Sequence, residues 1–331
     1  MLDTPPQALP AGKSVAQDVL TSLLSTIRLS ASVQFSIMAG GEWQVDADPL
    51  TQGLLREGRA TMPFHVIAEG ECWLKIDGES VAVEAGDILA FPWASRHQLG
   101  RGTCGVPIQP GFDLPERPWR AIPVLRYADD PDTRILCGFL QCDLLEFQPL
   151  KTALPQLIHI RTKPTGAATW LRAMVRQMVE EIDNPAGGGV SMLPRLTELM
   201  FIEILRSQIV SSEPHTAGWL AALSDVSMSR CLSFLHSEPQ RQWSLANLAL
   251  AAGMSRTALA GRFQALIGTS PMKYLRDWRL HLAGVALTTT QDPITKIAYE
   301  SGYGTEAAFT RAFRRAFGHP PAAWRRMKTE G

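Results

Sequence analysis

Apolar positions follow two different periods along this chain, and the period changes twice. Residues 14–29, SVAQDVLTSLLSTIRL, place apolar side chains at helical spacing, which predicts an amphipathic helix. The stretches SVQFSIMA, FHVIAEGECWLKIDG and ESVAVEAGDILAFP are short, rich in strand-forming residues and broken by Gly, Asp and Pro. Several strands at this spacing are typical of a β-sandwich or β-barrel, and we expect this region to extend to about residue 160.

The helical period returns at residue 165. A first predicted helix ends at the break NPAGGG, 184–189, and a second covers 192–210. The apolar stripe of the first helix consists of Trp170, Leu171, Met174, Val175, Met178, Val179 and Ile182. The two helices predict a hairpin that packs on the β-region or on a second subunit, and its apolar content makes it our candidate dimer surface.

These periods predict an α+β multidomain protein. We expect an N-terminal tail at 1–13, a β-rich domain at 14–164, and the helical hairpin with its linker at 165–217. An all-helical domain is expected at 218–331.

The last domain contains a predicted helical bend at about 244–267. Leu248 and Ala249 face inward on a short helix, and Gly253 follows where that helix should stop. Glycine adopts the left-handed backbone without the cost of about 1–2 kcal/mol that other residues incur. Ser255 is a natural N-cap for the next helix, so the segment has a helix-turn-helix layout.

A second bend at about 293–317 repeats the same order. Gly302 takes the turn, Thr305 caps the next helix, and three phenylalanines follow at intervals of four. Between the bends, Ser270 and Pro271 open a longer helix of about 18 residues, which spans roughly 27 Å. That length is of the right order to hold two bends near the ~34 Å spacing of successive major grooves.

The charge distribution favours a polyanionic partner. The chain carries 32 Lys and Arg against 32 Asp and Glu, yet residues 230–331 carry 14 against 6. A basic segment with two tandem bends predicts binding to double-stranded DNA. The arginines on or beside the second helices are Arg256, Arg262, Arg311, Arg314 and Arg315.

Composition excludes other classes. Of the 331 residues, 45% are hydrophobic and 19% are charged, which is typical of globular proteins. No apolar run is long enough to predict a membrane span, and the N-terminus lacks a secretory pattern. Five cysteines without framework spacing favour a reducing compartment, so we expect a cytoplasmic location.

Residues 226–327 resemble the DNA-binding domain of the AraC/XylS family of transcriptional regulators. The matching stretches are LANLALAAGMSRTALAGRF, PMKYLRDWRLHLA and ITKIAYESGYGTEAAFTRAFRRAFGHPPAAWRR. The family signature is matched in order by Gly302, Tyr303, Phe309, Phe313, Gly318, Pro320 and Pro321. The resemblance implies an asymmetric DNA site, with each second helix lying in a major groove.

By position, the resemblance implies that the first reading helix presents Arg256, Thr257, Ala260 and Gly261 to bases. Ala260 and Gly261 depart from the long polar residues common in the family. They offer only backbone approach or contact with a thymine methyl group. Arg262 is assigned to phosphates.

The second reading helix is expected to present Glu306, Ala307, Thr310 and Arg311. Arg311 can make a bidentate pair with guanine, and the alternatives are a phosphate contact or a solvated charge. Helix N-termini also bind phosphates. The remaining predicted DNA-binding residues are the caps Ser255 and Thr305, together with Arg314 and Arg315.

The stretch FHVIAEGECWLKIDGESVAVEAGDILAFPWASRHQL resembles a cupin barrel, through Gly70, Gly86, Asp87, Pro92 and His97. Residues 14–225 as a whole are similar to the cupin-like sensor in one branch of AraC-type regulators, with counterparts to TRILCGFLQCD and GWLAALSD. This resemblance implies a domain that senses a small-molecule effector or dimerises.

Enzymatic cupins hold a metal with two closely spaced histidines, a glutamate and a later histidine. This chain supplies only two histidines in the relevant stretches, and two imidazoles rarely suffice. We therefore expect no metal, no cofactor and no catalytic residue. Barrel mouths commonly hold ligands, although core packing explains the aromatic residues equally well. The candidate effector-lining residues are His65, Trp73, Phe91, Trp93 and His97.

The sequence thus predicts a two-domain, homodimeric transcriptional regulator that binds DNA and responds to an effector by a population shift. RNA polymerase is a further candidate partner. Three alternatives stay open: a cupin-type metal enzyme with an accessory DNA-binding domain, an architectural DNA binder, and a thiol redox sensor using Cys137 and Cys142.

Overall fold

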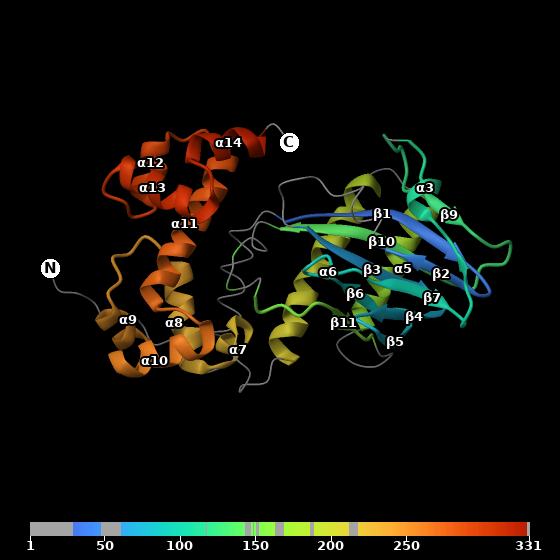
Figure 1. The fold of residues 1–331 in the computed structure, drawn as a ribbon, viewed down its shortest axis with the longest axis horizontal. Helices are drawn as coiled ribbons and strands as arrows, with labels where there is room; N and C mark the ends of the chain where they lie inside the picture. The colour runs from blue at the N-terminus through green and yellow to red at the C-terminus, as the bar shows by residue number, and fades with distance from the viewer. Residues whose placement is uncertain are drawn as a thin grey trace. The chain divides into compact units, whose positions relative to one another are not determined.

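A computed structural model describes residues 29–47, 61–116, 118–142, 147, 149, 152–162, 169–185, 189–211 and 218–329. They form two compact units (Figure 1). The described residues within 28–146 and 154–208 form the β-rich unit, and those within 147–153 and 209–331 form the helical unit. The helix predicted at 14–29 lies outside the described residues, except for Leu29, which begins the first described strand.

The β-rich unit contains two sheets. The six-stranded sheet has the order β11-β6-β3-β10-β1-β9, and the five-stranded sheet has the order β5-β4-β7-β2-β8. The strands are β1 (Leu29–Ala39), β2 (Trp43–Asp46), β3 (Thr61–Glu69), β4 (Glu71–Ile76), β5 (Glu79–Glu84), β6 (Ile88–Ala90), β7 (Gln98–Arg101), β8 (Val106–Pro107), β9 (Val124–Arg126), β10 (Thr133–Cys142) and β11 (Ile158–Ile160). A short helix, α3 (Pro110–Asp113), precedes β9.

Both sheets contribute to one apolar core. On β4, Cys72, Leu74 and Ile76 are buried, while the alternating positions Glu71 and Lys75 are exposed and Trp73 is half-buried, as expected for a strand with one face on a core. Residues of β1, β3 and β10 join the same core cluster. Alternation therefore buries one face of β4, whereas β3 is buried at every position from Met62 to Ile67, because α5 contacts this strand as well.

Helices α5 (Thr169–Asp183) and α6 (Gly189–Ser211) follow the strands. Along α5, Leu171, Met174 and Met178 are buried, whereas Trp170 is 41% exposed. The buried guanidinium of Arg134 on β10 donates two 2.7 Å hydrogen bonds to the carboxylate of Asp183. This ion pair fixes the end of α5 to the six-stranded sheet.

The helical unit contains eight described helices in chain order. They are α7 (Trp219–Ser224), α8 (Val226–Ser237), α9 (Leu245–Ala252), α10 (Arg256–Ile267), α11 (Pro271–Thr289), α12 (Ile294–Glu300), α13 (Glu306–Phe317) and α14 (Pro321–Thr329). Helices α9 and α10 pack with α7 and α8, whereas α12 and α13 pack with α11 and α14. The unit is thus two helical groups in succession.

The expected helix boundaries are confirmed by the cap geometry. Gly253 ends α9 with φ 71°, and Gly302 has φ 81° between α12 and α13. The side chains of Ser255 and Thr305 accept hydrogen bonds from the third backbone N–H of α10 and α13 respectively. These positive φ values favour glycine over any residue with a Cβ.

Buried aromatic residues hold the first helical group to α11. The indole N–H of Trp219 donates to the Tyr274 hydroxyl at 2.7 Å, and that hydroxyl lies 2.7 Å from His236 Nε2. Phe147, which is 3% exposed, packs edge-on against Tyr274 and Trp278 with ring centroids 5.4 and 5.1 Å away. A residue from before β11 therefore completes the core of the helical unit.

Candidate nucleic-acid interface

Helices α10 and α13 each bury one narrow face and expose the other. Leu259 and Phe263 are fully buried on α10, and Phe309 and Phe313 are fully buried on α13. Residues four apart share a helix face, so each buried pair leaves the opposite face outward. The sequence-predicted reading residues are exposed or half-buried, and Thr257, Gly261, Ala307 and Arg311 lie on these outward faces.

On α10, Arg256, Thr257 and Gly261 are exposed, and Ala260 is half-buried. A Cβ added at Gly261 would meet no atom within 4 Å. The middle of this face is therefore small and open, with one exposed arginine, Arg256, at the N-terminal end of the helix.

Arg262 has a partner inside the unit. Its guanidinium donates to Asp225 Oδ2 from both Nε, at 2.7 Å, and Nη2. Asp225 is also the N-cap of α8, because its Oδ1 accepts from the backbone N–H of Met228 at 2.9 Å. Sequence reasoning missed Asp225, although an aspartate directly before a predicted helix is a recognisable N-cap signal.

Helix α13 carries three exposed positive charges. Arg311, Arg314 and Arg315 are exposed, and within the described part of the chain none of these guanidinium groups has an ion pair or a side-chain hydrogen bond. Ala307 is exposed and Thr310 is half-buried on the same helix. These three charges are free to meet an anionic surface.

Glu306 brings a negative charge to the start of α13. Its carboxylate accepts a hydrogen bond from the hydroxyl of Thr295 on α12. The contact joins the two helices of the second pair next to the Thr305 cap. It restrains the carboxylate without neutralising it.

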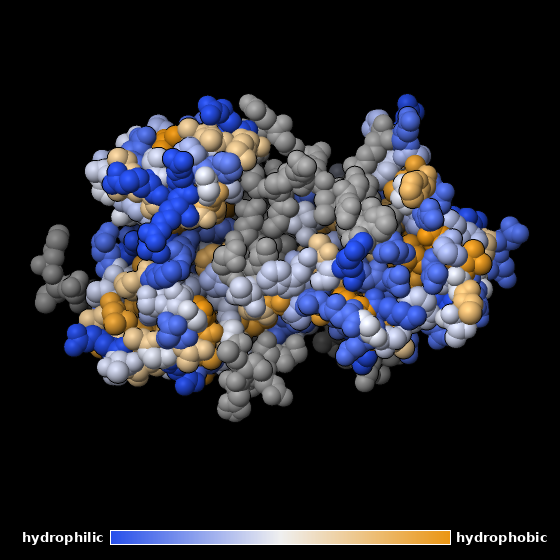
Figure 2. All heavy atoms as spheres, viewed as in Figure 1, coloured by the Kyte–Doolittle hydropathy of each residue, from blue (hydrophilic) through white to orange (hydrophobic). Residues whose placement is uncertain are grey.

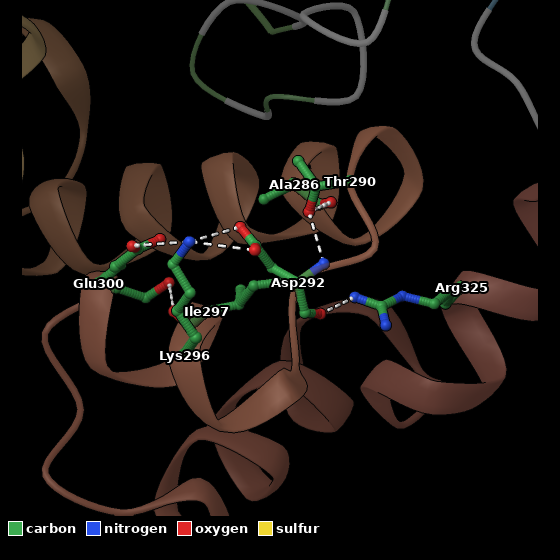
Figure 3. Close-up of polar contacts among 8 residues, drawn as sticks. Ala286, Thr290, Asp292, Lys296, Ile297, Glu300 and Arg325 are labelled. Carbon is green, nitrogen blue, oxygen red and sulfur yellow. Dashed lines mark hydrogen bonds and ion pairs between the residues drawn. The ribbon is translucent and has the colours of Figure 1, made fainter.

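Figure 3 shows how the connection between α11 and α12 is fastened. The Arg325 guanidinium of α14 donates to the backbone carbonyls of Leu287 and Asp292, at 3.0 and 2.6 Å. The Asp292 carboxylate accepts two 3.0 Å hydrogen bonds from Lys296, which raises the pKa of Lys296. These contacts fix where α12 begins.

Figure 2 shows many strongly hydrophilic residues on the visible face of the helical unit, with apolar residues interspersed.

In the β-rich unit, three of the candidate effector-lining residues come together. His65 Nε2 lies 2.8 Å from His97 Nε2, and the His97 ring stacks on Phe91 with centroids 3.7 Å apart. All three side chains are buried. The pKa of His65 is well below its usual value, mainly because the side chain is buried and to a smaller extent because His97 lies beside it. This imidazole is therefore neutral.

The two tryptophans do not join this cluster. Trp73 lies on the outer face of β4, where its indole N–H donates to the Gly102 carbonyl at 2.9 Å. Trp93 is 42% exposed, and its indole N–H donates to the Leu154 carbonyl at 2.9 Å. A cavity of about 230 Å³ lies elsewhere on this unit, lined partly by Gln44, Gln98 and Phe112.

The cluster does not have the geometry of a cupin metal site. Cys137 Sγ lies 3.1 Å from His65 Nδ1, on the opposite edge of the ring from His97, so thiol and imidazoles do not converge on one point. Among the described residues, no group of three or more His, Cys, Asp or Glu side chains could hold an ion.

Cys137 and Cys142 lie on the same strand, β10. Five residues of strand span about 17 Å at roughly 3.3 Å per residue, whereas a disulfide requires Cα atoms within about 7 Å. These two cysteines cannot pair within β10. Burial raises the pKa of the Cys137 thiol, and the side chain of Cys142 lies outside the described residues.

Among the described residues, no helix has the length and apolar content that a bilayer crossing requires.

Comparison with known proteins gives the same two-part organisation. A family model described as Cupin matches residues 18–210, and one described as Helix-turn-helix domain matches residues 248–327. Among solved structures, an AraC-type DNA-binding domain-containing regulator from Chromobacterium violaceum is 25% identical, covers 31% of this chain and 93% of its own, and gives a TM-score of 0.31.

Full-length relatives are regulators. A putative AraC-like transcription regulator of Streptomyces lividans is 28% identical over 317 residues, which cover 95% of this chain and 98% of that protein. The HTH-type transcriptional regulator AlkR of Acinetobacter baylyi is 29% identical over 318 residues, covering 94% and 99%. The chain therefore belongs to the AraC-type family of DNA-binding transcriptional regulators, in the group whose helix-turn-helix domain follows a cupin domain.

Proposed function

We propose that α9–α10 and α12–α13 act as two helix-turn-helix motifs, and that α10 and α13 enter successive major grooves on one side of a DNA duplex. The observation that carries this proposal is that Arg311, Arg314 and Arg315 are exposed on the face of α13 opposite Phe309 and Phe313 and form no ion pair with any described residue. At 1.5 Å per residue, the 19 residues of α11 span about 29 Å, comparable with the ~34 Å groove repeat.

The residues divide by role in this proposal. Arg256, Thr257, Ala260 and Gly261 meet bases from α10. The corresponding residues on α13 are Glu306, Ala307, Thr310 and Arg311. Backbone N–H groups behind the Ser255 and Thr305 caps face phosphates, and Arg314 and Arg315 neutralise phosphates.

The test is selection of duplexes from a randomised DNA library by the full-length protein, followed by affinity measurements at several salt concentrations. We expect a two-part, asymmetric consensus and an affinity that falls steeply with salt. Salt-sensitive binding without a consensus would instead identify an architectural binder. No binding to any duplex would contradict the proposal.

For the β-rich unit we propose a cupin barrel that responds to a small-molecule effector and dimerises through α5 and α6. The exposed Trp170, Met192 and Leu199 on these helices support the interface. The effector would shift the disposition of the DNA-binding units within a dimer in the cytoplasm, and so alter access to RNA polymerase.

Sedimentation of the full chain with and without DNA tests this second proposal, with Leu199→Glu as the interface variant. We expect a dimer for the wild type and a shift toward monomer for Leu199→Glu. If the wild type is a monomer both free and on DNA, the proposed dimerisation is contradicted.

A further inference from the structure

Beside the continuous helix α11, the side chain of Arg279 also joins the two helical groups of the helical unit. Arg279 lies on α11, one residue after Trp278 of the aromatic core and one before Leu280 of the α12–α13 core. It therefore lies where α11 passes from the first group to the second.

The Arg279 guanidinium binds the first group through backbone carbonyls. Nε donates to the Pro239 carbonyl at 2.6 Å, and Nη2 donates to the Arg241 carbonyl at 2.9 Å. Both carbonyls belong to the connection between α8 and α9. The segment that leads from α8 to α9 is thus anchored to α11.

The same guanidinium lies against the turn of the second group. A Cβ added at Gly302 would come within 2.8 Å of Nη1 and 3.2 Å of Cζ of Arg279. Gly302 is the left-handed residue between α12 and α13. One planar side chain consequently touches the entry to α9 and the entry to α13.

The space around this bridge is incompletely packed. A cavity of about 110 Å³ is lined by the 239–240 segment, by α11 and by α12, with Arg279 in its wall. Side-chain packing between the two groups is therefore incomplete here, and the polar bridge of Arg279 adds to the restraint that the continuous helix α11 provides. A guanidinium suits this role because it presents five N–H donors in a rigid plane.

We propose that Arg279 is a positioning residue that sets the distance and rotation between α10 and α13, and thereby the separation of the two half-sites that the protein accepts. The inference rests on the proposed binding of both helices to one duplex. Arg279 itself contacts no base. It acts by holding the second reading helix in register with the first.

The test compares full-length wild type, Arg279→Gln and Arg276→Gln on duplexes selected by the wild type, with zero, one or two base pairs inserted between the half-sites. Arg276 is the matched control, because its guanidinium lies three residues earlier on α11 and binds only Asp277 among the described residues. Thermal melting checks that each variant folds. If Arg279→Gln does not fold, Arg279→Lys takes its place, since one ammonium group cannot serve both carbonyls and Gly302.

One inserted base pair moves a half-site along and around the helix axis, so we expect it to weaken wild-type binding about tenfold or more. The affinity at the native spacing divided by the affinity at the inserted spacing measures the preference for spacing. For Arg279→Gln this ratio should be at least about threefold smaller than for the wild type. Arg276→Gln should keep the wild-type ratio even if its overall affinity drops.

An unchanged ratio for the Arg279 variant, including an equal loss at every spacing, would overturn the positioning role and leave two-helix binding intact. Wild-type binding that is indifferent to spacing would overturn both.

Discussion

Arg262 of α10 donates two hydrogen bonds to one carboxylate oxygen of Asp225, which also caps α8. The arginine that family position assigns to phosphates therefore holds α10 to the start of α8. A phosphate would have to compete with Asp225 for this side chain.

This contact predicts different costs for its two partners. Asp225→Ala removes the α8 cap, worth about 1 kcal/mol, and also the ion pair. Arg262→Met removes the ion pair alone, and because Arg262 is half-exposed we expect a loss below about 1 kcal/mol. Denaturant midpoints of the two variants measure the difference. A larger loss for Arg262→Met than for Asp225→Ala would contradict the assignment.

Substitutions of the exposed arginines of α13 should distinguish base reading from phosphate binding. Arg311→Ala should cost about 1–3 kcal/mol and relax specificity at one base pair. Arg315→Ala should weaken all sequences alike and lower the salt slope by about one. Binding to a panel of single-base variants distinguishes them, with Arg120→Ala, exposed in the segment before β9, as the charge control. A uniform loss for Arg311→Ala would reduce it to a phosphate contact.

Gly261→Ala should change stability and DNA binding in opposite directions. The added Cβ enters open space, and alanine is favoured over glycine inside a helix by about 0.5–1 kcal/mol, so the melting temperature should rise. On DNA the same methyl group would keep the α10 backbone from approaching the groove, so affinity should fall. Gly284→Ala, inside α11 where an added Cβ would meet its nearest atoms at 3.7 Å or more, is the control. Unchanged affinity for Gly261→Ala would place this face away from DNA.

Buried histidines should make the helical unit sensitive to acid. Burial lowers the pKa of His236 to about 3 and that of His281 to about 4. Trp219 can only donate to the Tyr274 oxygen, so the Tyr274 hydroxyl donates to His236 Nε2, and that nitrogen must stay unprotonated.

The sign of the pH effect follows from these lowered pKa values. Between pH 6.5 and the folded pKa, the unfolded chain binds the extra proton, so stability falls as pH falls, by about 1.4 kcal/mol per pH unit for each histidine. His236→Gln should flatten this slope between pH 4.5 and 6.5 in denaturant unfolding, whereas His319→Gln, at an exposed site, should not. A slope unaffected by His236→Gln would contradict the prediction.

Local features of the helical unit could be predicted from the sequence. Ser255, Ser270 and Thr305 cap the helices expected of them, and Gly253 and Gly302 adopt left-handed conformations. These features depend on a few neighbouring residues, so a single sequence specifies them. The outward position of Trp73 could also have been predicted, because Cys72 and Leu74 alternate with it.

Contacts between distant positions could not be predicted. Arg279 meets carbonyls some 40 residues earlier, and Arg262 meets Asp225 across 37 residues. No period or motif specifies such pairs, because they depend on how helices pack after they form. The direct contact between His65 and His97 depends in the same way on the pairing of separate strands.

Phe147 has a practical consequence for work on the DNA-binding half alone. It fills a slot over Tyr274 and Trp278, although about 70 residues of chain, including β11, α5 and α6, separate it from α7. A fragment cut at Gly218 would lose this ring, and removing a buried phenylalanine costs about 3–5 kcal/mol. Such a fragment would have an unfilled cavity in its core. Low stability of the fragment would then result from the position of the cut.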